Sequence, residues 1–369
     1  MIALIVDLET EWRGGQNQAL LTAKGILACG HDAHLVAIRD SPLARRAVQA
    51  GIQVHEVAAR AKRARAAVLL RKLLSQNKFG VVHANEPHAL TSAWLAAAHR
   101  KVPVVASRRV AYPLQNNAIA RSRYLMARRI LAVSRFVAAS VIESGLPADK
   151  VEVVYEGVEV PPAITPEAQE RARQRWSVAG NERLLGCVGY LLPEKGQESV
   201  LRAMPEVRAK FPGTRLLLAG DGPCRERLEA LAKQLDLQGA VVFAGFVEDI
   251  SLVYAALNIF VFPSLAEPLG TSLLAAMAWG LPVLAVASGG VPEYVHNGEN
   301  GLLVAESDPE LVADGLLRLL TNDSQRAELG RNARQTIEDK FSAGRMVENT
   351  LNAYQRVSDG RFPLSATES

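Results

Sequence analysis

Short apolar runs alternate with longer amphipathic segments along the whole chain. In the first half, the apolar runs predict strands at residues 2–6, 34–38, 54–56, 80–83, 104–107, 129–133 and 151–155. The segments between them carry apolar residues at helical spacing and predict helices, for example at residues 16–28, 64–76 and 89–99. Each strand is apolar almost throughout, which is typical of parallel strands that helices cover on both faces.

The same alternation restarts after the proline pair Pro161-Pro162. The second set of strands is expected at residues 184–189, 215–219, 241–244, 258–262, 282–285 and 301–304. We therefore predict an α/β protein with two Rossmann-like, doubly wound parallel-sheet domains that face a central cleft. The expected domains are residues 1–165 and 166–345. Residues 346–369 are expected to form a terminal helix, able to pack back on the first domain, and a frayed tail.

Charge divides the chain into two unlike halves. Residues 1–165 contain 22 lysines and arginines against 12 acidic residues, whereas residues 166–369 contain 20 against 26. Much of the excess of basic residues in the first half lies in the helix predicted after Arg60, where basic and apolar residues alternate at amphipathic spacing. Such a helix can lie on an anionic membrane surface, or it can be a solvated outer helix of the sheet. Nucleic acid is disfavoured, because aromatic residues make up 5% of the chain and none interleave with these charges.

The remaining composition excludes several classes of protein. Cys29, Cys187 and Cys224 stand singly without ligand spacing, which indicates reduced thiols rather than a disulfide frame or a metal site. No apolar run approaches the roughly 20 residues that a membrane-spanning helix needs. The pattern G-x-G-x-x-G does not occur, so dinucleotide redox chemistry is disfavoured.

The segment from Phe262 to Gly280 carries the most specific chemistry in the sequence. An apolar strand ends at Pro263, Glu267 and Gly270 follow, and a helix opens at Thr271. The carboxylate can accept hydrogen bonds from sugar hydroxyls, while the helix N-terminus favours phosphate oxygens. An ordinary strand-loop-helix with one acid is the competing interpretation.

Other strand ends add polar groups that could join such a site. Lys195 follows a strand and precedes a helix, where a fixed cation could stabilise a leaving diphosphate, although a lysine in such a loop is usually only solvated. The remaining candidates at strand ends, each also explicable as a turn or a structural residue, are Gly14-Gly15, His83, Asn85, Glu86, the pair Arg108-Arg109, Gly220-Asp221-Gly222 and Gly245-Phe246-Val247.

In their order and spacing, these segments resemble the family-4 retaining glycosyltransferases of the GT-B fold (glycosyl transferases group 1). The resemblance covers nearly the whole chain and is strongest in the second half. It is carried by Gly189…Lys195-Gly196, Gly220-Asp221-Gly222-Pro223, Ala244-Gly245, Pro263-Ser264…Glu267…Gly270, Gly280-Leu281-Pro282 and Gly289-Gly290-Val291-Pro292-Glu293.

The resemblance implies roles for individual residues. Glu267 would bind donor-sugar hydroxyls and Lys195 the diphosphate, with no metal or other cofactor. The implied donor-binding residues are Gly14, Gly15, Gly189, Tyr190, Asp221, Gly222, Gly245, Phe246, Val247, Pro268, Leu269, Gly270, Thr271, Ser272 and Ala275. The acceptor side would include His83, Asn85 and Glu86.

Three positions depart from the family pattern. Ala275 stands where a second glutamate usually binds the ribose, and Tyr190 stands where an arginine usually accompanies the lysine. The strand end at Ser107 carries two arginines in place of a catalytic histidine. We hypothesise that Arg108 or Arg109 restores the missing positive charge from across the cleft.

We therefore expect a retaining glycosyltransferase that moves a sugar from a nucleotide-sugar, such as a UDP-sugar, to a membrane-associated glycan or glycolipid. Cell-envelope polysaccharide or lipopolysaccharide is the expected acceptor class, and the expected location is cytoplasmic, peripheral on the inner membrane face. Two alternatives stay open: a sugar-nucleotide epimerase of GT-B type, and a non-catalytic homologue that binds a nucleotide or glycan, which Ala275 and Tyr190 make plausible. The base, the sugar, the acceptor's identity and the oligomeric state stay open.

Overall fold

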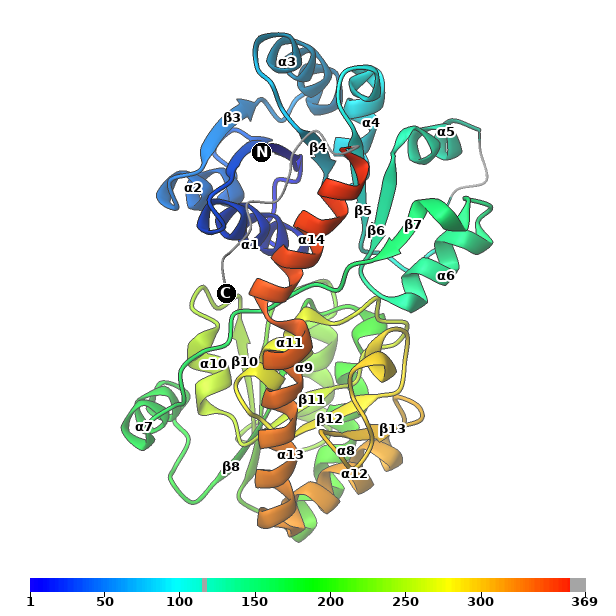
Figure 1. Cartoon of the computed structure of the whole chain (residues 1–369). Helices are drawn as coiled ribbons and strands as arrows, with labels where there is room; N and C mark the ends of the chain where they lie inside the picture. The colour runs from blue at the N-terminus through cyan, green and yellow to red at the C-terminus, as the bar shows by residue number, and fades with distance from the viewer. Residues whose placement is uncertain (115–117, 359–369) are drawn as a thin grey trace. The chain divides into compact units, whose positions relative to one another are not determined.

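The structure is a computed structural model that describes residues 1–114 and 118–358. The chain divides into two compact units: unit 1 comprises Met1–Gly157 and the chain from Ala343, and unit 2 comprises Val158–Ser342 (Figure 1). The boundaries therefore lie earlier than residues 165 and 345. The first boundary moves because the backbone N–H of Val158 donates to the carbonyl of Phe341 at 3.0 Å, so the chain joins unit 2 as soon as it leaves Gly157.

A seven-stranded parallel sheet forms the centre of unit 1, with the order β3-β2-β1-β4-β5-β6-β7. Its strands are β1 (Ile2–Val6), β2 (Asp32–Ile38), β3 (Gln53–Val57), β4 (Val81–Ala84), β5 (Val104–Arg108), β6 (Arg129–Ala132) and β7 (Val151–Val153). The strand order reverses between β1 and β4, and this switch point is where open α/β sheets bind their ligands.

Helices cover both faces of this sheet. They are α1 (Gly14–Ala28), α2 (Pro42–Gln49), α3 (Lys62–Gln76), α4 (Pro87–Leu95), α5 (Ala118–Met126), α6 (Arg135–Glu143) and α14 (Ala343–Val357), with short 3₁₀ helices η1 (Ala98–Arg100) and η2 (Ala148–Lys150). The helix predicted over residues 89–99 ends earlier than expected, because Ala97 adopts a left-handed conformation with φ +53°.

The helix α14 follows unit 2 in the sequence but belongs to unit 1, where it packs against α1. Its buried side chains, including Val347 and Tyr354, join one core cluster with α1, α2 and one face of the strands. A Cβ on Gly25 of α1 would come 2.2 Å from Cγ2 of Val347, so only glycine permits this close approach of the two helices. The last residues of the predicted terminal segment, 359–369, lie outside the described residues.

The sheet of unit 2 has six parallel strands in the order β10-β9-β8-β11-β12-β13. The strands are β8 (Arg183–Val188), β9 (Thr214–Ala219), β10 (Val241–Gly245), β11 (Ile259–Phe262), β12 (Val283–Val286) and β13 (Leu302–Val304). Its order reverses between β8 and β11, again a single switch point.

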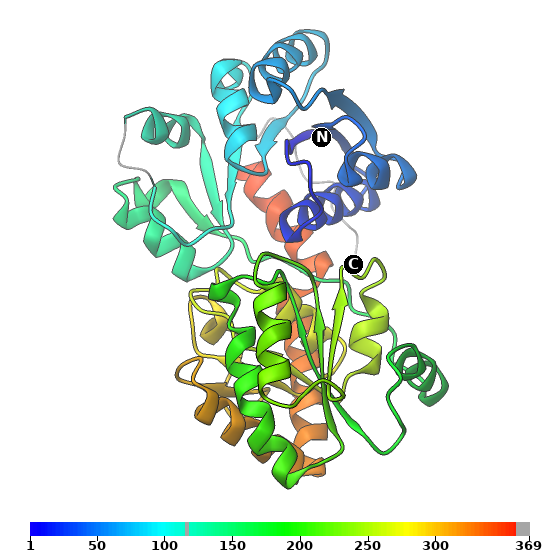
Figure 2. The same cartoon turned by 180° about the vertical axis from the view of Figure 1, so that it is seen from behind.

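The helices of unit 2 are α7 (Pro166–Arg175), α8 (Gln197–Lys210), α9 (Arg225–Gln234), α10 (Ser251–Ala256), α11 (Thr271–Ala278), α12 (Pro309–Thr321) and α13 (Asp323–Thr336), with the short helices η3 (Pro193–Lys195), η4 (Val291–Glu293) and η5 (Ile337–Phe341). The main core cluster lies between the sheet and the helices α8, α9 and α12. Figure 1 shows α11 and α13 in front of this sheet, and Figure 2 shows α8 and α9 in front of it from behind.

Two parallel-sheet, Rossmann-like domains are thus confirmed. Among the helices of the described residues, none combines the length and the apolar character needed to cross a membrane. The three cysteines are free thiols, two of them buried and Cys29 exposed.

Candidate functional site

The switch point of unit 2 brings together the two residues that were predicted to act on the donor. Lys195 closes η3, directly after β8, and Glu267 lies in the loop after β11, so the two come from neighbouring strands of the sheet. The Nζ atom of Lys195 donates to Oε2 of Glu267 at 2.6 Å. The hydroxyl of Ser264 donates to the same oxygen at 2.7 Å, which orients the carboxylate.

Close backbone packing holds Lys195 beside this loop. Gly196, directly after the lysine, has φ +68°, and a Cβ there would lie 2.2 Å from the carbonyl oxygen of Pro263. The backbone N–H of Leu265 donates to the carbonyl of Glu194 at 2.8 Å. The two loops are therefore fixed to each other by backbone contacts, independently of the ion pair.

A second loop supports the backbone of Glu267. The N–H of Gly290 donates to the carbonyl of Glu267 at 2.9 Å, and a Cβ on Gly289 would lie 2.0 Å from that carbonyl oxygen. The buried hydroxyl of Tyr294 donates to the carbonyl of Leu269 at 2.6 Å. Burial, followed by the charge of Glu267, raises the pKa of Tyr294 well above its usual value, so this tyrosine acts as a donor and not as an anion.

The helix α11 begins at Thr271 without a side-chain cap. Its N-cap residue is Gly270, with φ +94°, which has no side chain to cap the helix. A helix N-terminus with backbone N–H groups and no capping side chain favours an anion such as a phosphate.

The remaining predicted donor residues of unit 2 lie at the same edge of the sheet. Backbone hydrogen bonds connect the ends of the neighbouring strands β8, β9 and β10. The N–H of Leu191 donates to the carbonyl of Asp221 at 2.9 Å, and the N–H of Gly220 donates to the carbonyl of Gly245 at 2.8 Å. Tyr190 and Phe246 expose 44% and 67% of their surface there, so aromatic faces are available at this edge. Gly189, Gly222, Val247, Pro268 and Ala275 are partly buried.

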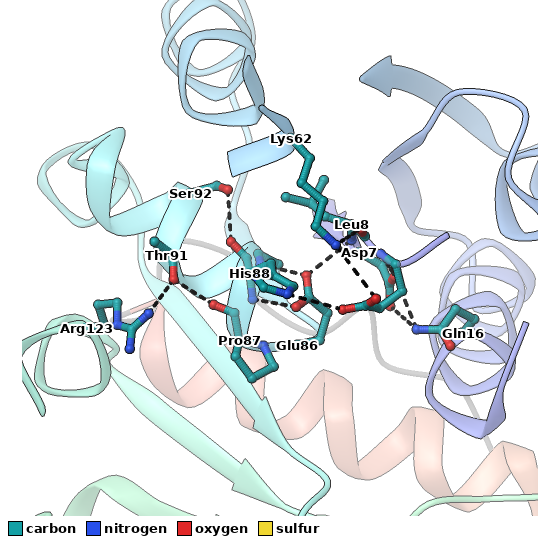
Figure 3. A network of polar contacts seen from close by, with 12 residues as sticks. Asp7, Leu8, Gln16, Lys62, Glu86, Pro87, His88, Thr91, Ser92 and Arg123 are labelled. Carbon is teal, nitrogen blue, oxygen red and sulfur yellow. Dashed lines mark hydrogen bonds and ion pairs between the residues drawn. The ribbon is translucent and has the colours of Figure 1, made fainter. Parts of the chain in front are cut away.

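The switch point of unit 1 holds a second polar cluster, around Asp7 at the end of β1 (Figure 3). The amide of Asn85 donates to Oδ2 of Asp7 at 2.6 Å and to the carbonyl of Gly15 at 3.0 Å. The amide of Gln16 donates to the same carboxylate at 3.0 Å. These contacts fix the Gly14-Gly15 turn, at the start of α1, against the ends of β1 and β4.

Glu86 caps α4 beside this cluster. Its carboxylate accepts from the N–H groups of Ala89 (2.6 Å), Leu8 (3.2 Å) and His88. Burial, followed by the charge of Asp7, raises the pKa of Glu86 to about 7, although the backbone N–H donors act in the opposite direction.

Asp7 and Gln16 had not been assigned to the site, and three further unassigned residues join it in the structure: Glu9, Lys62 and His88. The Nζ atom of Lys62 lies 3.7 Å from Oε2 of Glu9 and donates to the carbonyl of Leu8 at 2.8 Å. Figure 3 shows Lys62 reaching toward Leu8. Nε2 of His88 lies 3.8 Å from Oε1 of Glu9. Glu9 and His88 follow β1 and β4 closely, so the switch-point rule could have identified them, whereas Lys62 comes from a helix distant in sequence.

His83 lies inside unit 1, not at an accessible acceptor surface. It is 3% exposed, with Nδ1 2.5 Å from the hydroxyl of Tyr354 and Nε2 2.7 Å from that of Ser107. Burial, with a smaller effect of Arg109, lowers the pKa of His83 to about 3. A neutral imidazole with both nitrogens in contact with hydroxyls links β4, β5 and α14, which is a structural role.

The two arginines after β5 are both held within unit 1. Arg108 is buried, where its guanidinium contacts the rings of Tyr112 and Tyr124 and donates to the hydroxyl of Tyr124 at 3.2 Å. Arg109 donates to Glu156 Oε1 and to the carbonyl of Asn85, each at 2.6 Å. A role for either arginine toward a diphosphate stays a prediction.

Comparison with known proteins associates both halves of the chain with glycosyltransferases. The family model described as "Glycosyl transferases group 1" matches residues 168–336, and that described as "Glycosyltransferase Family 4" matches residues 12–160. These matches cover the loops of Lys195 and Glu267 in unit 2, and the helices α1 and α4 of unit 1.

Individual relatives agree with the family matches. The chain is 31% identical over 219 residues to a GDP-mannose-dependent alpha-(1-6)-phosphatidylinositol monomannoside mannosyltransferase of Mycolicibacterium smegmatis, covering 57% of each chain. It is 35% identical over 155 residues to the lipopolysaccharide core biosynthesis glycosyltransferase LpsE of Rhizobium meliloti, covering 42% of this chain and 44% of the relative. The aligned part thus spans about half the length of these relatives.

A solved structure confirms the fold over nearly the whole chain. Anabaena Alr3699/HepE in complex with UDP and glucose superposes with a TM-score of 0.84 at 22% identity, covering 95% of this chain and 98% of the other. At this identity the likeness establishes the fold alone.

Proposed function

We propose that this chain, which belongs to the family-4, group 1 glycosyltransferases of the GT-B fold, transfers a sugar from a nucleoside diphosphate sugar to a membrane-associated glycan or glycolipid. The observation that carries the proposal is the 2.6 Å pair of Lys195 and Glu267 at the switch point of unit 2. A cation and a carboxylate held side by side, next to an uncapped helix N-terminus, match a diphosphate and a polyol respectively.

The two side chains exchange partners when the donor binds. Lys195 turns its ammonium toward the diphosphate, and Glu267 accepts hydrogen bonds from sugar hydroxyls while Ser264 continues to orient it. As the bond between the anomeric carbon and the phosphate oxygen breaks, negative charge grows on the diphosphate. A cation already fixed beside it stabilises that charge more strongly in the transition state than in the ground state.

We propose that transfer proceeds with retention and without a metal ion. The acceptor hydroxyl attacks the anomeric carbon on the face that the diphosphate leaves, and its proton passes to the departing phosphate oxygen. One C–O bond forms, one breaks, and no redox partner is required. Lys195 and the N-terminus of α11 supply the positive charge that a bound cation would otherwise provide.

A membrane-associated acceptor is supported by the charge of unit 1 and by the relatives. The outer face of α3 exposes Arg63, Arg65, Arg71 and Lys72. One relative is named for a phosphatidylinositol mannoside substrate and the other for lipopolysaccharide core synthesis. We place the protein at the cytoplasmic face of the membrane, where nucleotide-sugars and lipid-linked acceptors meet.

A thermal-shift screen against UDP-, GDP-, ADP- and dTDP-sugars tests the donor site, because a ligand that binds only the folded state raises the unfolding temperature. The stabilising donor is then assayed for transfer and hydrolysis with wild type, Lys195→Met and Lys210→Met. Lys210 is exposed and far along α8, so its variant serves as the control. We expect Lys195→Met to lower kcat by about 100-fold or more and Lys210→Met to have no effect.

The outcomes separate the alternatives. Stabilisation by a donor without transfer or hydrolysis would favour a non-catalytic nucleotide-binding homologue, which Ala275 and Tyr190 at the donor edge make a specific alternative. Conversion of the donor to an epimer without an acceptor would identify an epimerase. Equal activity of Lys195→Met and Lys210→Met would refute the proposed role of the ion pair.

A further inference from the structure

We propose that Glu9, Glu86 and His88 form a binding site for one divalent transition-metal ion, with Zn²⁺ as the reference ion, at the switch point of unit 1. All three residues belong to unit 1, and the site does not rest on the proposed function. Each of the three side chains offers one ligand atom, and these atoms lie within 4.8 Å of one another.

The distances suit a small ion after minor side-chain movement. Zn²⁺ bound to nitrogen and oxygen at about 2.1 Å in a tetrahedron separates neighbouring ligand atoms by about 3.4 Å. Nε2 of His88 and Oε1 of Glu9 are already 3.8 Å apart. The other pairs of ligand atoms lie within 4.8 Å, so up to about 1.4 Å remains to be closed. The side chains of Glu9 and His88 are 39% and 41% exposed, so both can move to close it.

The backbone around the cluster is rigid. Glu86 and His88 are two residues apart at the start of α4, where three backbone N–H groups fix the Glu86 carboxylate. Glu9 is held by its own N–H, which donates to Oδ1 of Asp7 at 3.0 Å. A metal ion would therefore find its ligands on a prearranged frame and would need to order only two side-chain ends.

The charge of the cluster favours a cation. Three carboxylates, those of Asp7, Glu9 and Glu86, lie together, and one cation, Lys62, contacts Glu9 at 3.7 Å. The carboxylate of Asp7 accepts hydrogen bonds from the neutral amides of Asn85 and Gln16.

The ammonium of Lys62 competes with a metal ion for the carboxylate of Glu9. The effect of removing Lys62 is therefore the sharpest test of the site. Removal of a ligand must weaken metal binding, whereas removal of Lys62 must strengthen it, because a positive charge leaves the site. A purely structural disturbance of the cluster would weaken binding in both cases. Arg63 and Arg123 also act on His88 and stay in place in all variants.

Isothermal titration of Zn²⁺ into the full-length, chelator-treated protein at pH 7.5 measures the site. We expect one high-affinity Zn²⁺ per chain, at least about tenfold weaker binding in Glu9→Gln and in His88→Asn, and tighter binding in Lys62→Met. His55→Asn serves as the control, because His55 forms a separate pair with His34 at 3.1 Å. Unfolding temperatures in EDTA check that each variant folds.

Three outcomes would overturn the site: wild type that binds no Zn²⁺, a Glu9→Gln/His88→Asn double variant that binds as wild type does, or loss of the bound ion in His55→Asn. Weaker binding in Lys62→Met would also contradict it. Glu86→Gln does not test metal binding alone, because Glu86 also caps α4 and its loss alters the helix start.

Discussion

His83 illustrates how burial decides the role of a single residue. A histidine at a strand end could have been a proton donor or acceptor for an acceptor sugar, but its imidazole lies between the hydroxyls of Tyr354 and Ser107. The cost of charging a buried ring lowers the pKa of His83 to about 3, so the neutral form persists throughout the physiological range. Lys195 and Glu267 instead pair with each other at the edge of their sheet, where their loops meet.

The lowered pKa of His83 makes the folded state of unit 1 less stable in acid. The unfolded chain protonates His83 near pH 6.5 while the folded chain resists protonation, so its stabilising contribution is present above pH 6.5 and is lost as the pH falls toward 3. Between pH 7 and pH 5 this loss amounts to about 2 kcal/mol. Urea unfolding in EDTA should show this fall in the free energy of unfolding in wild type and a clearly smaller fall in His83→Gln. The control His99→Gln, at an exposed position, should behave as wild type does. Parallel pH profiles of wild type and His83→Gln would contradict this assignment.

At the scale of elements, the loop from β11 to α11 depends on the loop that follows β12. Gly289 and Gly290 lie directly against the backbone of Glu267, and Tyr294 binds the carbonyl of Leu269. The order of glycine, acid and helix start in the sequence indicates that a ligand loop exists. It does not indicate which distant segment supports it, because that support comes from contacts across the sheet edge.

Gly289→Ala should therefore disturb the Glu267 loop specifically. Its φ of +56° is unfavourable for alanine, and the new Cβ would lie 2.0 Å from the carbonyl oxygen of Glu267. We expect a loss of about 2 to 4 kcal/mol in the free energy of unfolding and weaker donor binding. Gly298→Ala is the matched control: its φ is +81° but nothing lies within 4 Å, so about 1 kcal/mol is expected from conformation alone. Urea titration and donor titration give both quantities, and equal effects of the two substitutions would rule out the contact.

At the scale of the whole molecule, charge is distributed by domain. The first 165 residues carry the excess of basic residues, and α3 exposes several of them together with Val68, which is 66% exposed. Lys62 departs from this pattern, because it turns toward Leu8 and Glu9 and is thus part of the unit 1 cluster. The membrane-facing role that we propose for α3 therefore rests on its other basic residues.

Binding to vesicles tests that role. Wild type should cosediment with vesicles of phosphatidylglycerol and phosphatidylcholine, less so as salt rises, and not with phosphatidylcholine alone. Each basic residue near an anionic surface contributes about 1 kcal/mol, so replacing Arg63, Arg65, Arg71 and Lys72 by glutamine should weaken binding at least about 100-fold. The same change at the exposed Lys210, Lys233, Arg318 and Arg331 of unit 2 should have little effect. Equal losses in both variants would show that total charge, not α3, directs binding.

The order of strands and helices, the parallel sheets and the two domains follow from the sequence, because local apolar runs and their period report burial directly. The meeting of Glu267 and Lys195 also follows from the sequence, since the carboxyl ends of parallel strands meet at one edge, while their role toward a donor stays a prediction. The return of α14 to unit 1 was expected as a possibility and is confirmed, whereas the enclosure of His83 and the reach of Lys62 into the Asp7 cluster could not be read in advance. Each depends on contacts between segments far apart in sequence, and no local pattern records which distant partner a side chain meets when the chain folds.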